Sequence, residues 1–141
     1  MGFLAHFQTV SIWAALIAAV SVFMLGGAWY SPALFLKPWF AAQGMKEEDG
    51  NEKHGATPFV ISFFMSLIAA VLFGALLGPR PGIQNALGYA LIIGLGWVAT
   101  SFGINYSFAG KSPKLWLIDA GYHVAQFLVY ALVFGLWGLL P

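Results

Sequence analysis

Residues 59–77 read FVISFFMSLIAAVLFGALL, and this stretch decides the fold. It carries no charge, and as an α-helix it is long enough to cross a bilayer, which needs about 20 apolar residues. Three further stretches share this character, so the predicted spans are residues 7–29, 59–77, 85–108 and 114–136. We therefore expect an all-α integral membrane protein, a single transmembrane domain over residues 1–141 built as a bundle of four transmembrane helices.

The composition of the whole chain agrees with a membrane environment. Hydrophobic residues make up 60% of the chain and charged residues only 8%, whereas soluble domains carry roughly 25% charged residues. The lipid bilayer is thus an expected partner. A net charge of +1 without a basic patch argues against binding to nucleic acid. The absence of cysteine excludes disulfides, thiolate metal sites and cysteine nucleophiles.

The connections between the spans differ in character. Residues 34–40 predict a short interfacial helix after the first span, which Pro38 should interrupt or make irregular. Residues 44–57 form a polar loop that holds seven ionisable side chains, and we interpret it as a solvated connector. Three pairs are each typical of a helix N-cap followed by proline at the first helical position. They are Ser31-Pro32, Thr57-Pro58 and Ser112-Pro113.

The ends of the spans indicate how the chain sits in the membrane. The first span lacks the Lys/Arg-rich start of a signal peptide, so we interpret it as a true span. Interfacial aromatic anchors are expected at Trp29, Tyr30, Trp39 and Trp137. Five lysines belong to the first and third connections, and Arg80 alone belongs to the second. Because Lys and Arg accumulate on the cytoplasmic side, both termini are predicted outside the cytoplasm.

Small residues recur every four positions in the second span. Such a ladder lines one face of a helix and lets another helix backbone approach closely in lipid. We therefore predict helix packing, either within the bundle or between subunits, along this ladder. Its members are Ser62, Ser66, Ala70, Gly74 and Gly78.

The last span carries the most specific feature, a polar stripe on an apolar helix. Asp119 is the only carboxylate inside a predicted span, and Tyr122, His123, Gln126 and Tyr130 continue its helix face. Such a stripe should face the bundle interior, a cavity or another subunit. Partners are expected nearby, from Thr100, Ser101, Asn105, Tyr106, Tyr30, Lys111 and Lys114. The predicted intramembrane polar site comprises Asp119, His123, Tyr122, Gln126, Asn105 and Tyr30.

Three roles are open for Asp119 and His123. In the first, they satisfy each other and their neighbours and so fix the helix register. In the second, they form a proton-responsive or substrate-binding site, because ionisable residues inside a membrane are functional candidates. In the third, they ligate a metal or haem, although one histidine and one aspartate make a poor ligand set. We expect no metal, no cofactor and no enzymatic activity, since no phosphate-binding loop or paired nucleophile and base is found.

Two motifs link the chain to a family. The first is Gly26-Gly27-Ala28-Trp29-Tyr30-Ser31-Pro32-Ala33-Leu34-Phe35 with Trp39 and Gly44, and the second is Leu117-Ile118-Asp119-Ala120-Gly121-Tyr122-His123. Over nearly its whole length the chain resembles a bacterial four-span membrane family, domain-of-unknown-function family 1761. The resemblance implies a small polytopic protein of the bacterial inner (plasma) membrane, without an established activity. It places Trp29, Tyr30, Pro32, Asp119, Tyr122 and His123 at family motif positions.

Two functional classes follow from these observations. One is a non-catalytic accessory, assembly or interaction subunit of a membrane complex, which docks through its small-residue faces. The alternative is a small homo-oligomeric carrier or channel, linked to protons through Asp119 and His123. Four short helices enclose little volume alone, so a homo-oligomer or a larger membrane complex is expected in either case.

Overall fold

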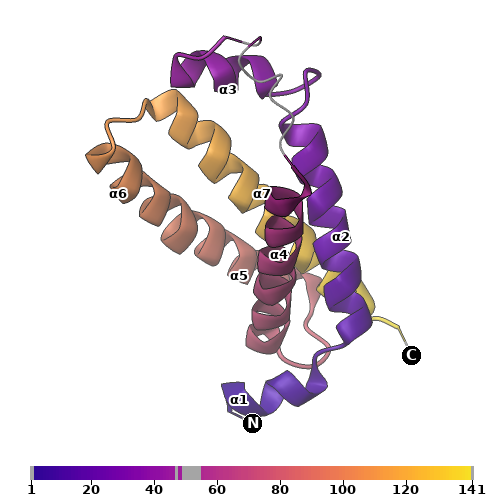
Figure 1. Ribbon diagram of the computed structural model, residues 1–141. Coiled ribbons are helices and arrows are strands. Elements are labelled where there is room, and N and C mark those ends of the chain that lie inside the picture. Colours follow the sequence, from indigo (N-terminus) through magenta and orange to yellow (C-terminus); the bar gives the residue numbers. More distant parts are fainter. Residues whose placement is uncertain (1, 47, 49–54, 141) are drawn as a thin grey trace.

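The computed structural model describes residues 2–46, 48 and 55–140. Throughout these residues the secondary structure is helical, without a strand, which confirms the predicted fold class. Four segments are long and apolar enough to cross a membrane: α2 (Ile12–Trp29), α4 (Ala56–Leu77), the third span (Ile83–Phe108) and α7 (Pro113–Trp137). Figure 1 shows both ends of the chain at the same end of the bundle, as an even number of crossings predicts.

Helix α7 is the centre of the bundle. It contacts α2, α4 and the third span, which contains α5 (Ile83–Leu91) and α6 (Thr100–Phe108). The core where these helices meet is built largely from alanine, which lets helix backbones approach closely. Its members are Ala14, Ala15, Ala18 and Val22 of α2, Ala70 and Phe73 of α4, Ala86 and Ala90 of α5, and Tyr130, Ala131 and Phe134 of α7.

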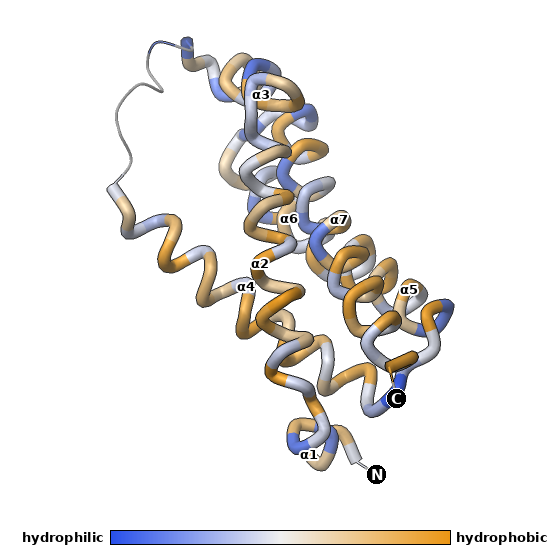
Figure 2. Tube along the Cα trace, turned by 90° about the vertical axis from the view of Figure 1, so that its right-hand side faces the viewer, coloured by the Kyte–Doolittle hydropathy of each residue, from blue (hydrophilic) through white to orange (hydrophobic). Residues whose placement is uncertain are grey.

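Helix α4 packs against its neighbours over only part of its length. Its C-terminal half contributes buried residues to the core, whereas residues 56–62 are all exposed. Figure 2 shows the N-terminal end of α4 turning away from α2. In this upper part Phe63 still contacts Phe23, edge to face, with ring centroids 6.2 Å apart. The apolar surface of the first turns of α4 is therefore available to lipid or to another chain.

The chain before α2 departs from the predicted first span, residues 7–29. Ser11 caps α2 by accepting a hydrogen bond from the backbone N–H of Ala14 at 3.3 Å, so the helix begins at Ile12. The preceding residues form α1 (Phe3–His6) and the 3-10 helix η1 (Phe7–Thr9), both of which contact α4.

A short helix, α3 (Leu36–Gln43), lies across the end of the bundle opposite the termini (Figure 1). Pro38 does not interrupt it, because residues in the first turn of a helix have no intrahelical acceptor for an N–H.

Two predicted N-caps are wrong. Helix α4 begins at Ala56, before Thr57, and the Ser31 hydroxyl donates to a preceding carbonyl within a turn. The Ser112 cap is confirmed, since its Oγ accepts a hydrogen bond from a first-turn N–H at 3.2 Å.

The third span, predicted as one α-helix over residues 85–108, contains the π-helical segment η3 (Ile92–Ala99). Where α-helical geometry resumes after such a segment, a backbone carbonyl is left without its usual donor. Two side chains donate hydrogen bonds to backbone carbonyls of this region. The Thr100 hydroxyl donates to a carbonyl one turn earlier at 2.8 Å, and the Trp116 indole N–H donates to the carbonyl of Ala99 at 2.8 Å.

Candidate functional site

Asp119 lies in the second turn of α7, near the end of the bundle that α3 covers. The Ser112 cap and Pro113 fix the start of this helix and therefore the level at which Asp119 lies. Only 7% of the Asp119 side chain and backbone is exposed. An ionisable group buried to this degree needs hydrogen-bonding partners.

Three side chains donate hydrogen bonds to the Asp119 carboxylate. The Tyr30 hydroxyl and the Trp39 indole N–H reach Oδ1 at 2.8 and 3.0 Å. The Tyr106 hydroxyl reaches Oδ2 at 2.6 Å. Tyr30 follows α2, Trp39 belongs to α3 and Tyr106 to α6. We call these four residues the carboxylate cluster, and it connects α7 to three other parts of the fold.

The turn after α2 explains how the first part of this cluster reaches α7. The backbone N–H of Phe35 donates to the carbonyl of Trp29 at 3.0 Å and closes the turn. The Trp29 indole N–H in turn donates to the carbonyl of Ile118 at 3.1 Å. Gly121 makes room for this indole, because a Cβ at that position would lie 3.3 Å from the ring. The first family-like motif therefore packs directly on the second.

All three donors to Asp119 are neutral. Within the described part of the chain Asp119 forms no ion pair, so Lys111 and Lys114 are not the partners that the sequence suggested. Burial, and then the hydrogen bond to Asp119, raise the pKa of the Tyr30 hydroxyl, which keeps this group protonated as a donor. An indole N–H can only donate, and hydrogen bonds to a charged acceptor are the stronger kind. All three hydrogen bonds therefore end on the two oxygens of Asp119 as acceptors.

A second set of polar side chains runs along α7 towards α4. The Nδ1 atom of His123 lies 2.7 Å from Oε1 of Gln126, whose Nε2 donates to the Tyr130 hydroxyl at 2.8 Å. The Tyr130 hydroxyl donates to the carbonyl of Ser66 at 2.7 Å. Its proton is thereby used, so the Ser66 hydroxyl, at 2.7 Å, donates to Tyr130. We call these four residues the histidine chain.

The direction of the histidine chain assigns the tautomer of His123. Because Nε2 of Gln126 faces Tyr130, its carbonyl oxygen faces His123, and the imidazole proton is placed on Nδ1. The imidazole packs on the Phe102 ring with centroids 4.9 Å apart. No hydrogen bond joins Asp119 to His123, since each of the two side chains has its own hydrogen-bonding partners among the described residues.

The structure also places the other predicted site residues. The Tyr122 hydroxyl donates to a backbone carbonyl of α2 at 3.5 Å, and its ring packs on Tyr30 with centroids 5.5 Å apart. Asn105 is exposed and forms no side-chain hydrogen bond within the described residues, so it does not join Asp119. The neighbouring Tyr106 reaches Asp119 instead. Tyr106 was among the expected partners of the stripe, whereas Trp39 was predicted only as an interfacial anchor and is the member of the cluster that sequence reasoning missed.

The predicted ladder on α4 is divided between different surroundings. Its buried members are Ser66, Ala70 and Gly74. Ser62 is exposed, because α4 turns away from α2 at that level. Gly78 lies against the ring of His6 rather than against another span, and a Cβ there would lie 3.0 Å from Cε1 of this ring. Trp137, a predicted anchor, is half-buried at the end of α7.

Two cavities lie away from both sets of polar residues. One, of about 430 Å³, is at the end of the bundle where the termini lie, beside Arg80, Phe134 and Trp137. The other, of about 290 Å³, is lined by apolar residues that include Phe73 and Phe127. Neither is lined by a residue of the carboxylate cluster. Among the described residues, no three histidine, aspartate or glutamate side chains are grouped to hold a metal ion.

Comparison with known proteins gives one match. A family model described as "Protein of unknown function (DUF1761)" matches residues 13–135. This range contains every member of the carboxylate cluster and of the histidine chain. No curated protein and no solved structure matches the chain.

Proposed function

Because the chain belongs to the DUF1761 family, whose function is unknown, we propose its role from the geometry of the carboxylate cluster. The proposed role is that of a non-catalytic accessory subunit, which assembles with other membrane proteins. In this role Asp119 holds the fold together and does not handle a substrate or a proton.

The observation that carries the proposal is that both oxygens of Asp119 are occupied. A carboxylate that binds a substrate or transfers protons needs an approach for the ligand or for water. Asp119 instead accepts three hydrogen bonds and is only 7% exposed. It lines neither of the two cavities. Buried polar groups that are fully paired make a structure rigid and specify one arrangement.

Purification at the natural expression level in a mild detergent tests the accessory role. We expect the chain to be recovered with other membrane proteins at a constant ratio, because the exposed apolar surface of α4 is suited to contact with another chain. A mock purification from cells that carry the untagged chain is the control. Recovery of the chain without any other membrane protein, in several mild detergents, would contradict the proposal.

The histidine chain favours a second candidate, the proton-linked carrier or channel. Its three contacts of 2.7 to 2.8 Å join an imidazole, an amide and two hydroxyls across the middle of the bundle. The two roles differ in proteoliposomes that contain a pH-sensitive dye. The accessory role predicts no proton flux above that of empty vesicles, whereas a flux that His123→Ala abolishes would favour the carrier.

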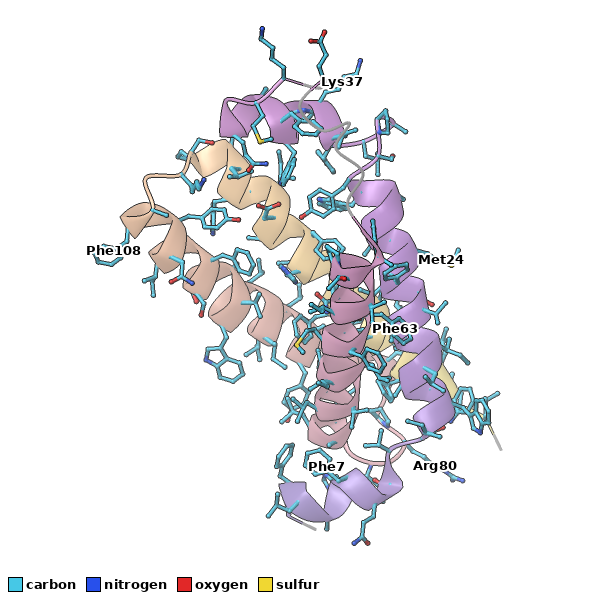
Figure 3. All side chains as sticks on the ribbon, viewed as in Figure 1. Phe7, Met24, Lys37, Phe63, Arg80 and Phe108 are labelled. Atoms are coloured by element: carbon cyan, nitrogen blue, oxygen red, sulfur yellow. The ribbon has the colours of Figure 1, made fainter. Side chains whose placement is uncertain are left out.

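We place the chain in a bacterial inner membrane with both termini outside the cytoplasm. The support is the distribution of Lys and Arg. Figure 3 shows Lys37 and Arg80 at opposite ends of the bundle, in keeping with this distribution. Residue 47 and residues 49–54 of the polar loop lie outside the described residues. Lys53 therefore enters the count of Lys and Arg in the connections from the sequence alone.

Single cysteines test this topology in the cysteine-free chain. Met45→Cys and Gly82→Cys lie in exposed connections on opposite sides, and a Cβ at Gly82 meets no atom within 4 Å. A membrane-impermeant thiol reagent added to intact cells should label position 82 and spare position 45. After the cells are broken both should react, which controls for accessibility. Labelling of position 45 alone in intact cells would reverse the assignment.

A further inference from the structure

Helix α6 leaves one of its faces uncovered, and this face is partly polar. It consists of Ser101, Ile104, Asn105 and Phe108, whose spacing puts them on one side of the helix. All four are exposed, Ile104 to 62% and Phe108 to 93%. Figure 3 shows Phe108 pointing away from the rest of the protein. We call these four residues the α6 face.

The polar members of the α6 face have no partners within the described part of the chain. Neither the Ser101 hydroxyl nor the Asn105 amide forms a hydrogen bond there. At 1.5 Å per residue, Asn105 lies about 5 Å and Ser101 about 10 Å inside the end of the helix at Phe108. The third span is long and apolar enough to cross a membrane. Hydrocarbon offers neither donors nor acceptors, so an uncovered hydroxyl and amide are unfavourable in it.

We propose that a second copy of this chain covers the α6 face. Two copies inserted with the same topology present parallel α6 helices, so identical residues lie at the same depth. Around a two-fold axis along the membrane normal, each residue of the face therefore meets its counterpart. A primary amide both donates and accepts, so two Asn105 side chains satisfy each other reciprocally. A lipid tail or a wholly apolar helix cannot do so.

The dimer is compatible with the carboxylate cluster. Tyr106 is directed towards Asp119 of α7, whereas the residues of the α6 face are exposed. Contact between two α6 faces would therefore leave the hydrogen bonds to Asp119 in place. The inference rests on the proposed accessory function, because it names one partner of that subunit.

Disulfide formation in native membranes tests the proposal. Ile104→Cys introduces a thiol into the α6 face and keeps both Ser101 and Asn105. Leu117→Cys is the matched control, since Leu117 is also 62% exposed and lies on α7 near the same end of the bundle. With copper phenanthroline as oxidant, we expect the Ile104→Cys variant to become a disulfide-linked dimer and the Leu117→Cys variant to stay monomeric. Absence of dimer at position 104, or equal yields at both positions, would overturn the proposal.

The role of the amide is tested in the same background. Adding Asn105→Leu to Ile104→Cys should lower the dimer yield severalfold, whereas the helix content by circular dichroism should not change, because Asn105 is exposed within a single chain. An unchanged yield would overturn the amide contact. If position 104 forms no dimer but the chain still purifies with other membrane proteins, the second copy is excluded and the accessory role stands. If the chain purifies only as a homodimer, the accessory role with other membrane proteins is excluded, whereas the α6 contact between two copies stands.

Discussion

Replacing Asp119 with leucine is expected to destabilise the protein strongly. Leucine is similar in size but removes the acceptor shared by Tyr30, Trp39 and Tyr106. Each buried donor left without a partner costs about 1–3 kcal/mol, so a loss on the order of 3 kcal/mol is expected, with part of the cost relieved where a donor reaches lipid headgroups or water. The measurement is the melting temperature in detergent, followed by circular dichroism.

The comparison with Asp119→Asn separates hydrogen bonding from ionisation. The asparagine carbonyl oxygen still accepts from Tyr30 and Trp39, and its amide donates to the Tyr106 oxygen, so we expect a loss of only about 1 kcal/mol. The structural role therefore predicts that the melting temperature of this variant falls by only about 2–5 °C and that the variant keeps its membrane partners. Gln84→Leu, at an exposed position, is the silent control. If the Asp119→Leu variant has the same melting temperature as the unmodified protein, Asp119 does not stabilise the fold.

Gly74→Leu is expected to have an effect of similar size through packing. A Cβ at position 74 would lie 2.7 Å from the Phe134 ring, closer than real contacts allow, and 3.2 Å from Val10, which is a tight contact. Phe134 is buried in the core and also lines, with Gly74, the cavity of about 430 Å³, so its ring can yield only towards that cavity and with a loss of core contacts. Overpacking of this kind typically costs 1–3 kcal/mol, and the three further carbons of leucine place the effect at about the upper end of that range. The variant should melt early or aggregate when extracted.

A variant of the same helix controls for the change in size. Leu76→Phe enlarges a side chain on α4 that is exposed, so its melting temperature should stay close to that of the unmodified protein. Gly74→Ala provides a smaller step, which should be less harmful than leucine but still destabilising. Equal melting temperatures for Gly74→Leu and Leu76→Phe would show that the close packing of Phe134 on Gly74 does not contribute to stability.

The spans were predictable because hydrophobicity and length are properties of short stretches of sequence. A hydroxyl before a proline was a weaker guide, because it marks the helix cap at Ser112 but not at Ser31 or Thr57. The start of α2 was not predictable from hydrophobicity, since residues before Ser11 are also largely apolar. There the serine side chain, bonded to the Ala14 N–H, decides where the helix begins.

The partners of Asp119 were only partly predictable, for a physical reason. Tyr30 was expected because it ends the first span at the level of Asp119. The choice between Asn105 and Tyr106 depends on the rotation of α6, and η3 changes that rotation by departing from the 3.6-residue period. Glycines at positions 94 and 96 do not predict a π-helix. The face that α6 turns towards α7 could therefore not be derived from the sequence.

The bonds to Asp119 also set an order of events during synthesis. Tyr30 and Asp119 are 89 residues apart, and Trp39 and Asp119 are 80 apart. Tyr30 and Trp39 are therefore synthesised long before Asp119. Until α7 enters the membrane, Trp39 of α3 lacks the carboxylate to which it donates. Chains that stall before α7 keep these donors unpaired. Such unfinished chains should be preferred substrates for membrane quality-control proteases, which remove proteins whose polar groups remain unsatisfied.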